Sequence, residues 1–426
     1  MELFEDVFER IIIMNKLKNA FHTRYDSIDK LYFIMNLIFC IAIFLCGYFT
    51  RHTCDYSAHS LGLASISFRP YKILRYINKS GYPLWFLCGG VICRVLSCSS
   101  NTGAGICTGL WLIISFLGVI YFLRKHFNEK ANKYLVATLS FILFIVGPIW
   151  IPWKNKYIIL GCGGPNVWHN ATNICGRAVG IFAFFYCMIL LEKMVKSDYT
   201  YIPNLKRCVC LSFILFLSLF AKPSFIQSFA PSFAILLIYY LIKSKGAFIK
   251  QFLVFCAASI LPLLYLIRQF LFYFSTSNTN PGLETDVSGN GITIEFPPVS
   301  DCLHTIDCHI LILMFPMIMF ALMAIKGKLD IYHAVVWLMH FFANTYALLL
   351  HGSAHGEMGW AVYIAYFFVY LVGVRDFIYL YFMDCKWENT KVKAISFSAA
   401  CTVLAVNILV GLIYLYLLIV LKKIIF

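Results

Sequence analysis

Charged side chains are scarce in this chain of 426 residues. Asp, Glu, Lys and Arg together make up 13% of it, whereas 61% is hydrophobic, and the mean hydropathy is +0.78. Soluble globular proteins carry about 25% charged residues, so the composition excludes an ordinary soluble domain. It predicts a polytopic membrane protein, in which nearly every segment lies in lipid or against another lipid-embedded segment.

Acidic residues are scarcer than basic ones, at 20 against 35, and the formal net charge is +15. In a soluble chain this excess would suggest nucleic acid, but here Lys and Arg fall between apolar runs, where they set the orientation in the membrane. We therefore expect no nucleic-acid partner. The first apolar run also lacks an A-x-A-like cleavage site, so we expect it to remain as a helix.

Cys-x-x-Cys pairs are absent among the 17 cysteines, and the spacing does not suggest a structural zinc site. Most of these cysteines lie inside apolar runs, where the residue acts as a small hydrophobe. An oxidising compartment would allow a disulfide between Cys302 and Cys308, or between Cys162 and Cys175.

Eleven apolar runs are long enough to cross about 30 Å of hydrocarbon. They predict one all-α domain over residues 1–426, a polytopic bundle of about 11 transmembrane helices, with 10–13 as the range. The runs lie near residues 31–50, 104–124, 133–151, 176–192, 207–221, 223–242, 249–273, 308–325, 331–350, 357–382 and 395–421.

The distribution of basic residues predicts the orientation. A cytoplasmic N-terminus puts 22 of the 35 Lys and Arg in short internal segments, as expected for a multi-pass protein of the plasma membrane. The polar stretches then gather outside, in a first external loop at 51–103 and a long external loop at 274–307. Within the first loop, Tyr82 to Ser97 is either an extra span or an interfacial or re-entrant helix, and we favour the second reading.

The first candidate constellation is Asp55-Tyr-Ser-Ala-His59, directly after the first apolar run. Residues four apart share one face of a helix, and a carboxylate in a partly dry cleft can serve as a general base. The alternative is a solvated aspartate that caps a helix.

The second constellation places Trp168, His169 and Asn170 in consecutive positions before the next span. The indole can stack on a sugar ring while the other two donate hydrogen bonds. Trp is also a common anchor at the membrane interface. In a eukaryotic source, Asn170-Ala-Thr172 and Asn78-Lys-Ser80 would fit the N-glycosylation pattern.

Two cations, Arg177 and Lys222, fall at the external ends of spans in this topology. Either can hold a lipid phosphate through charge-assisted hydrogen bonds, or snorkel to the headgroups. A third constellation, His351-Gly-Ser-Ala-His355-Gly-Glu357-Met-Gly-Trp360, combines imidazoles, a carboxylate and an indole. It suits substrate binding or, as a less favoured reading, a divalent metal such as Mg or Mn.

Together these stretches resemble the GT-C superfamily of bacterial polytopic glycosyltransferases. The residues that carry the resemblance are Asp55-Tyr-x-x-His59, Tyr82-Pro-Leu-Trp85, Pro165-Asn-Val-Trp-His-Asn-Ala-Thr172, Lys222-Pro-Ser-Phe225 and the glycine-rich loop before Trp360. The familiar motif in the first loop has paired acidic residues, whereas Tyr56 follows Asp55 here.

The resemblance implies a sugar donor linked to polyprenyl phosphate or a similar lipid, and a glycan, lipid or protein acceptor at the cell surface. Asp55 is then the general base of an inverting displacement, while Lys222 or Arg177 holds the leaving phosphate. His59, Trp168, His169, Asn170, His355, Glu357 and Trp360 are then substrate-binding residues, surrounded by membrane lipids.

Two other functions fit the same size and number of spans. A polysaccharide polymerase of the O-antigen or capsule type would transfer a whole glycan and depend more on external Arg and His. A flippase or transporter for a lipid-linked saccharide would show paired broken helices and charges buried in mid-span. The carboxylate in the first loop favours the glycosyltransferase.

Overall fold

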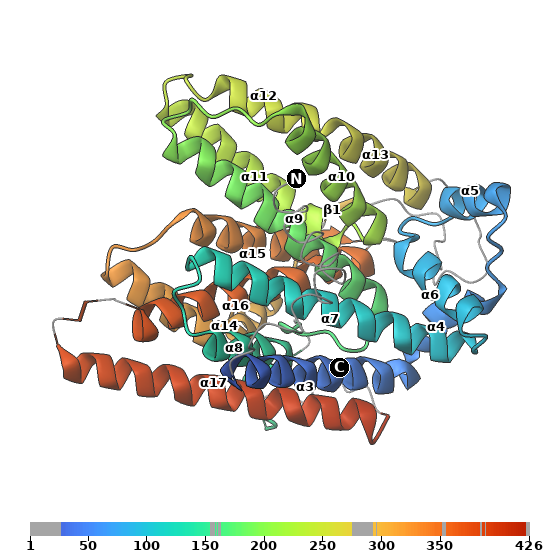
Figure 1. Cartoon of the computed structure of the whole chain (residues 1–426), viewed down its shortest axis with the longest axis horizontal. Helices are drawn as coiled ribbons and strands as arrows, with labels where there is room; N and C mark the ends of the chain where they lie inside the picture. Colours follow the sequence, from blue (N-terminus) through green and yellow to red (C-terminus); the bar gives the residue numbers. More distant parts are fainter. Residues whose placement is uncertain are drawn as a thin grey trace.

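The computed structural model describes residues 27–153, 158, 160, 163–274, 293–294, 296–351, 355–383, 386–387 and 389–422. This part of the chain is almost entirely helical (Figure 1). Two short strands, β1 (Thr293–Ile294) and β2 (Leu350–His351), pair antiparallel. The predicted all-α class and multi-pass membrane character are confirmed.

Seven helices of the described chain are long and apolar enough to cross a membrane. A bent pair, α12 (Ile249–Ala258) and α13 (Ile260–Phe274), gives an eighth span if its halves, which meet at 42°, are counted together. The seven are α3 (Ser27–Phe49), α7 (Ser100–His126), α9 (Ala171–Lys196), α11 (Ser224–Lys243), α14 (Val299–Ile325), α16 (His355–Phe382) and α17 (Thr390–Ile419).

The predicted count of about 11 spans is not confirmed. The other three predicted runs form helices that are shorter or less apolar than a span requires: α8 (Lys133–Ile145), α10 (Leu205–Ala221) and α15 (Ile331–Leu349). Helix α8, with 13 residues, rises only about 20 Å. Hydropathy averaged over a run does not reveal where the helix inside it stops.

Helix α8 stops because Gly147-Pro148 follows it, and the residue before a proline disfavours the helical conformation. The backbone then pairs with α17. Gly147 donates its N–H to the Asn407 carbonyl at 2.8 Å, and the Asn407 amide donates to the Gly147 carbonyl at 2.7 Å. A Cβ at Gly411 would clash with the Ile145 carbonyl, so glycine is required for this close approach.

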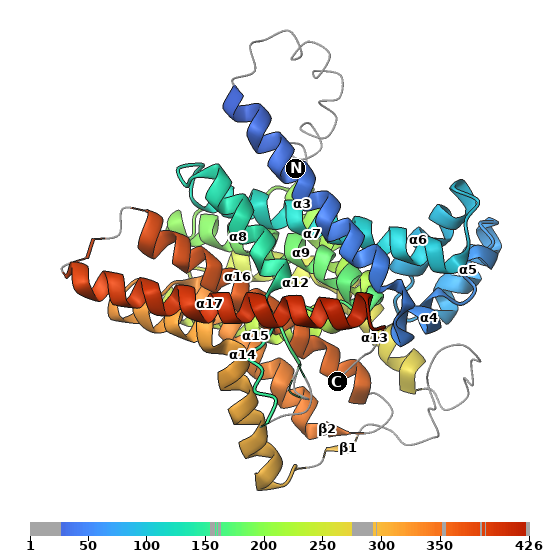
Figure 2. The same cartoon turned by 90° about the horizontal axis from the view of Figure 1, so that it is seen from below.

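The centre of the bundle is formed by α9 and α16. In their most apolar windows 89% and 94% of the residues are buried, against 11% for α3, which lies at the edge. Figures 1 and 2 show α3 and α17 on the outside of the bundle. Buried residues of α9 and α16 therefore face protein, whereas much of α3 faces the surroundings.

The first predicted loop, 51–103, is largely helical and forms one end of the molecule (Figures 1 and 2). It contains η1 (Thr50–His52), α4 (Cys54–Ser60), η2 (Leu63–Ser65), α5 (Pro70–Lys79) and α6 (Leu84–Val95). Helix α6 has 12 residues and rises about 18 Å, too little to cross the hydrocarbon. Both α4 and α6 pack on α7 and α9.

The second predicted loop, 274–307, is shorter than expected. Residues 275–292 and 295 lie outside the described residues, and α14 begins at Val299 rather than near 308. Cys302 and Cys308 are therefore six residues apart on one helix, about 9 Å along its axis. A disulfide cannot bridge that distance, so this pairing is wrong. Cys175 is a buried free cysteine, and Cys162 lies outside the described residues.

Candidate functional site

Helix α4 carries Asp55 and His59 one turn apart, as the spacing predicts. Asp55 is half-buried and lies in the first turn of the helix. The His59 ring packs edgewise against Trp85 and Phe86, with centroid distances of 6.3 and 5.8 Å. Burial and, second, the positive charge of Lys222 lower the pKa of His59 to about 3. The imidazole is therefore neutral at ordinary pH.

Asn170 joins α4 to the central helix. It caps the N-terminus of α9, where its Oδ1 accepts from the Asn173 N–H at 2.8 Å and from the Thr172 hydroxyl at 3.0 Å. Its Nδ2 donates to Asp55 Oδ2 at 3.3 Å. These contacts fix both the amide and the carboxylate orientation. Because the side chain is 2% exposed, Asn170 cannot accept a glycan.

Lys222 lies beside this cap, at the corner between α10 and α11. It is buried, and its ammonium donates to Thr172 Oγ1 at 3.2 Å. The same nitrogen lies over the rings of Tyr82 and Trp360, 5.1 and 4.9 Å from their centroids. Residues from four distant parts of the chain thus meet around one cation and one carboxylate. We call Asp55, His59, Asn170, Lys222 and Trp360 the α9 site.

His169 connects the α9 site to α17 through contacts with Trp360 and Tyr414. Its Nδ1 is 2.5 Å from the Tyr414 hydroxyl of α17, and its ring lies 5.8 Å from that of Trp360. The imidazole is buried, which lowers its pKa to about 3 and keeps it neutral. His169 thus packs against the indole of Trp360 in the α9 site.

Two predicted site residues lie elsewhere. Trp168 is 2% exposed and packs in the hydrophobic core, so it is not available to stack on a sugar. The Arg177 guanidinium lies between the rings of Phe144 and Phe367, at 5.0 and 4.5 Å, and donates to Asn166 Oδ1 at 2.8 Å. The cavity beside it measures about 10 Å³, room for about one water and too little for a phosphate.

The third sequence motif is described only at its end. Trp360 lies in the α9 site, whereas the side chains of His351, His355 and Glu357 are outside the described residues. Among the described residues, no three His, Cys, Asp or Glu side chains gather as metal ligands would. The proposed divalent metal thus has no support from the described part of the chain.

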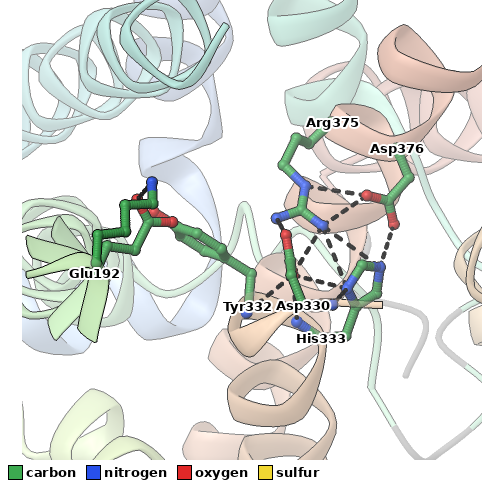
Figure 3. Close-up of polar contacts among 7 residues, drawn as sticks. Glu192, Asp330, Tyr332, His333, Arg375 and Asp376 are labelled. Carbon is green, nitrogen blue, oxygen red and sulfur yellow. Dashed lines mark hydrogen bonds and ion pairs between the residues drawn. The ribbon is translucent and has the colours of Figure 1, made fainter. Parts of the chain in front are cut away.

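Sequence reasoning missed a charge cluster formed by Asp330, His333, Arg375 and Asp376 (Figure 3). His333, Arg375 and Asp376 are buried, whereas the Asp330 side chain is 38% exposed. We call these four residues the buried charge cluster. Arg375 donates to Asp330 at 2.8 Å and to Asp376 at 2.7 Å, and His333 bridges the two carboxylates at 2.8 and 2.9 Å. Partial loss of hydration would raise the pKa of Asp330, but the His333 hydrogen bond and the Arg375 charge hold it well below its usual range.

This cluster joins α15 to α16 near a helix end, since Asp330 is the N-cap of α15. The cluster also includes Arg375 and Asp376, which lie within the candidate span Gly359–Phe382, seven and six residues before its end. The signal that could have revealed it is Arg375-Asp376, a charged pair within the apolar run 357–382.

Comparison with known proteins does not assign a function to this chain. No protein-family model matches the chain, and no curated protein shows significant sequence similarity to it.

Proposed function

We propose that this protein is a membrane glycosyltransferase of the GT-C type. It would move a sugar from a polyprenyl-phosphate or similar lipid-linked donor to a cell-surface glycan, lipid or protein, on the extracytoplasmic side of the plasma membrane. The observation that supports this proposal best is the Asn170 to Asp55 hydrogen bond, 3.3 Å long, beside the Lys222 ammonium. A carboxylate and a cation in one cluster suit proton removal and phosphate departure.

In this mechanism, Asp55 takes the proton of the acceptor hydroxyl as its oxygen attacks the anomeric carbon. The bond between that carbon and the lipid phosphate breaks, and the phosphate leaves with the electron pair. Lys222 stabilises the departing negative charge through its ammonium. The ammonium lies near the base because Lys222 contacts Thr172, and Asp55 contacts Asn170, in the same first turn of α9. Trp360 is the sugar-stacking residue in place of the buried Trp168.

Other predicted site residues take supporting roles. His59 is neutral because of its lowered pKa, so its imidazole can accept a hydrogen bond from a sugar hydroxyl or donate one to it. Arg177 anchors the segment before α9 through Asn166, whose amide also donates to the carbonyls of Leu143 and Val146 at 2.8 and 3.0 Å. Arg177 thus positions the site and does not bind the phosphate.

The test replaces Asp55 by Asn, which keeps the shape and removes the base. We expect a loss of transfer of roughly 10²–10⁴-fold, measured as release of polyprenyl phosphate from a polyprenyl-phosphate hexose by purified protein. Asp198→Asn is the matched control, because Asp198 is exposed, lies after the far end of α9 and has φ 47°, which Asn tolerates. Equal rates in Asp55→Asn and wild type would refute the assignment.

Mass spectrometry of surface glycans from a strain that lacks the protein separates the three functions. A single missing sugar supports the glycosyltransferase. Shortened chains indicate a polymerase, and accumulated internal lipid-linked precursor indicates a flippase. Only wild-type protein, and not Asp55→Asn, should restore the missing sugar.

A further inference from the structure

A second cavity lies at the opposite end of α7 and α9. Its volume is about 420 Å³, within the range of roughly 300–1,000 Å³ usual for small-molecule sites. It is lined by Tyr121, Phe122, Lys125, His126, Asn128, Tyr186, Ile189, Leu190, Glu192, Lys193, Lys196, Arg207 and Tyr332. We call this the basic cavity.

The basic cavity is far from the α9 site. Asn170 caps the start of α9, and Glu192 lies 22 residues later on the same helix. At 1.5 Å per residue this is about 33 Å, close to the thickness of the hydrocarbon layer. A ligand in the basic cavity therefore cannot touch Asp55, and its role is separate from sugar transfer.

Charge is the main feature of its rim. Lys125 comes from α7, Lys193 and Lys196 from α9, and Arg207 from the start of α10. Glu192 is the only carboxylate among the lining residues, and it pairs with Lys196 at 3.0 Å. Four cations against one carboxylate give the cavity an excess of positive charge, which favours an anion.

Its floor is formed by buried aromatic and aliphatic side chains. Phe122, Leu190 and Tyr332 are buried, and the Tyr332 ring packs on Phe122 and on His126 at centroid distances of 5.8 and 5.4 Å. Figure 3 shows the Tyr332 side chain extending from the buried charge cluster towards Glu192. The cluster holds the start of α15 and, with it, this part of the floor.

A cationic rim above an aromatic and aliphatic floor fits a ligand with an anionic head and an apolar body. Lys and Arg donors recognise phosphate oxygens, and basic pockets between transmembrane helices bind anionic lipid headgroups. We propose that the basic cavity binds a phosphate group, carried by an anionic phospholipid or by a small soluble phosphate. The proposal is independent of the sugar-transfer reaction.

Binding can be tested with purified full-length protein in a neutral maltoside detergent. Phosphatidylglycerol or phosphatidylcholine is added, and bound lipids are counted by native mass spectrometry. Inorganic phosphate and glycerol 3-phosphate are tested separately by thermal unfolding. We expect the first phosphatidylglycerol to bind at least about tenfold more tightly than phosphatidylcholine. Stabilisation by a soluble phosphate without lipid preference would instead identify the soluble source.

Two variants assign the binding to the cavity. Lys125→Gln/Lys193→Gln removes two cations and should weaken binding by roughly 30-fold. Ile189→Trp fills the cavity without changing charge and should also weaken it. The control, Lys243→Gln/Lys250→Gln, removes two exposed lysines outside the cavity and should bind as wild type does.

The proposal fails in either of two cases: none of the four probes binds, or the two cavity variants bind as well as the control. Far-UV circular dichroism verifies that each variant keeps its helices. Because no sugar transfer is measured, a negative result here leaves the proposed function untouched, and the reverse also holds.

Discussion

The α9 site and the buried charge cluster surround their cations in different ways. Lys222 lies over the rings of Tyr82 and Trp360 and donates to a hydroxyl at 3.2 Å. Arg375 donates to two carboxylates at 2.7 and 2.8 Å. Ring faces attract a cation through their quadrupole, whereas the two carboxylates compensate the charge of Arg375 directly. Under the proposed function Lys222 serves the leaving phosphate, whereas Arg375 holds α15 to α16.

Replacement of Arg375 by Met should have the largest effect on stability. It would leave Asp376, whose side chain is 2% exposed, as a buried charge without its arginine, which costs about 3–5 kcal/mol. We expect a large fall in the midpoint of thermal unfolding in detergent, with Arg94→Met, an exposed arginine, as the control. Arg375→Met/Asp376→Asn should recover part of the loss. If Arg375→Met unfolds at the same temperature as Arg94→Met, the cluster does not stabilise the contact between α15 and α16.

Replacement of Lys222 by Gln should give the opposite pattern. Transfer should fall by roughly 10²–10³-fold, because the leaving phosphate loses a positioned cation, while the unfolding midpoint changes much less than in Arg375→Met. Lys243→Gln is the matched control, since Lys243 also lies over a tyrosine ring, 5.5 Å from its centroid, but is exposed. Full activity per folded molecule in Lys222→Gln would remove the distinction between the two cations.

The smallest effect is expected from His59. The pKa of His59 in the folded protein is about 3, below its ordinary value of 6.5. Between these two pH values His59 is therefore protonated in the unfolded chain but neutral in the folded protein. The stabilising contribution is complete above pH 6.5 and is lost as the pH falls towards 3. The unfolding midpoint of wild type should therefore decrease between pH 6.5 and 4.5 by roughly a few degrees more than that of His59→Gln. Parallel pH profiles would show that His59 is not buried as neutral imidazole.

The sequence predicted the positions of the long helices, because hydropathy alone identifies segments that must avoid water. It did not predict where helices break inside those segments. Gly147-Pro148 lies within the run 133–151, yet the helix ends at Ile145. The distant partner that compensates for this break, Asn407, cannot be found by any local pattern.

Part of the α9 site was also predictable. The sequence analysis assigned Asp55 as the base and Asn170 as a substrate-binding residue of one enzyme, and the two side chains contact each other in the structure. The direction of each side chain was not predictable, since neighbours in sequence can face opposite ways: Trp168 enters the core while Asn170 faces Asp55. The basic cavity was not predicted, because Lys and Arg between apolar runs were attributed to the orientation of the protein in the membrane.

Helix α17 has a consequence for the order in which the molecule assembles. It supplies Tyr414 to His169 across 245 residues of sequence and Asn407 to Gly147 across 260. Contacts so distant in sequence form late, because the intervening chain must first be in place. During synthesis, the α9 site would therefore be complete only after α17 has docked. A chain without α17 would leave the Gly147 N–H and carbonyl without their Asn407 partners.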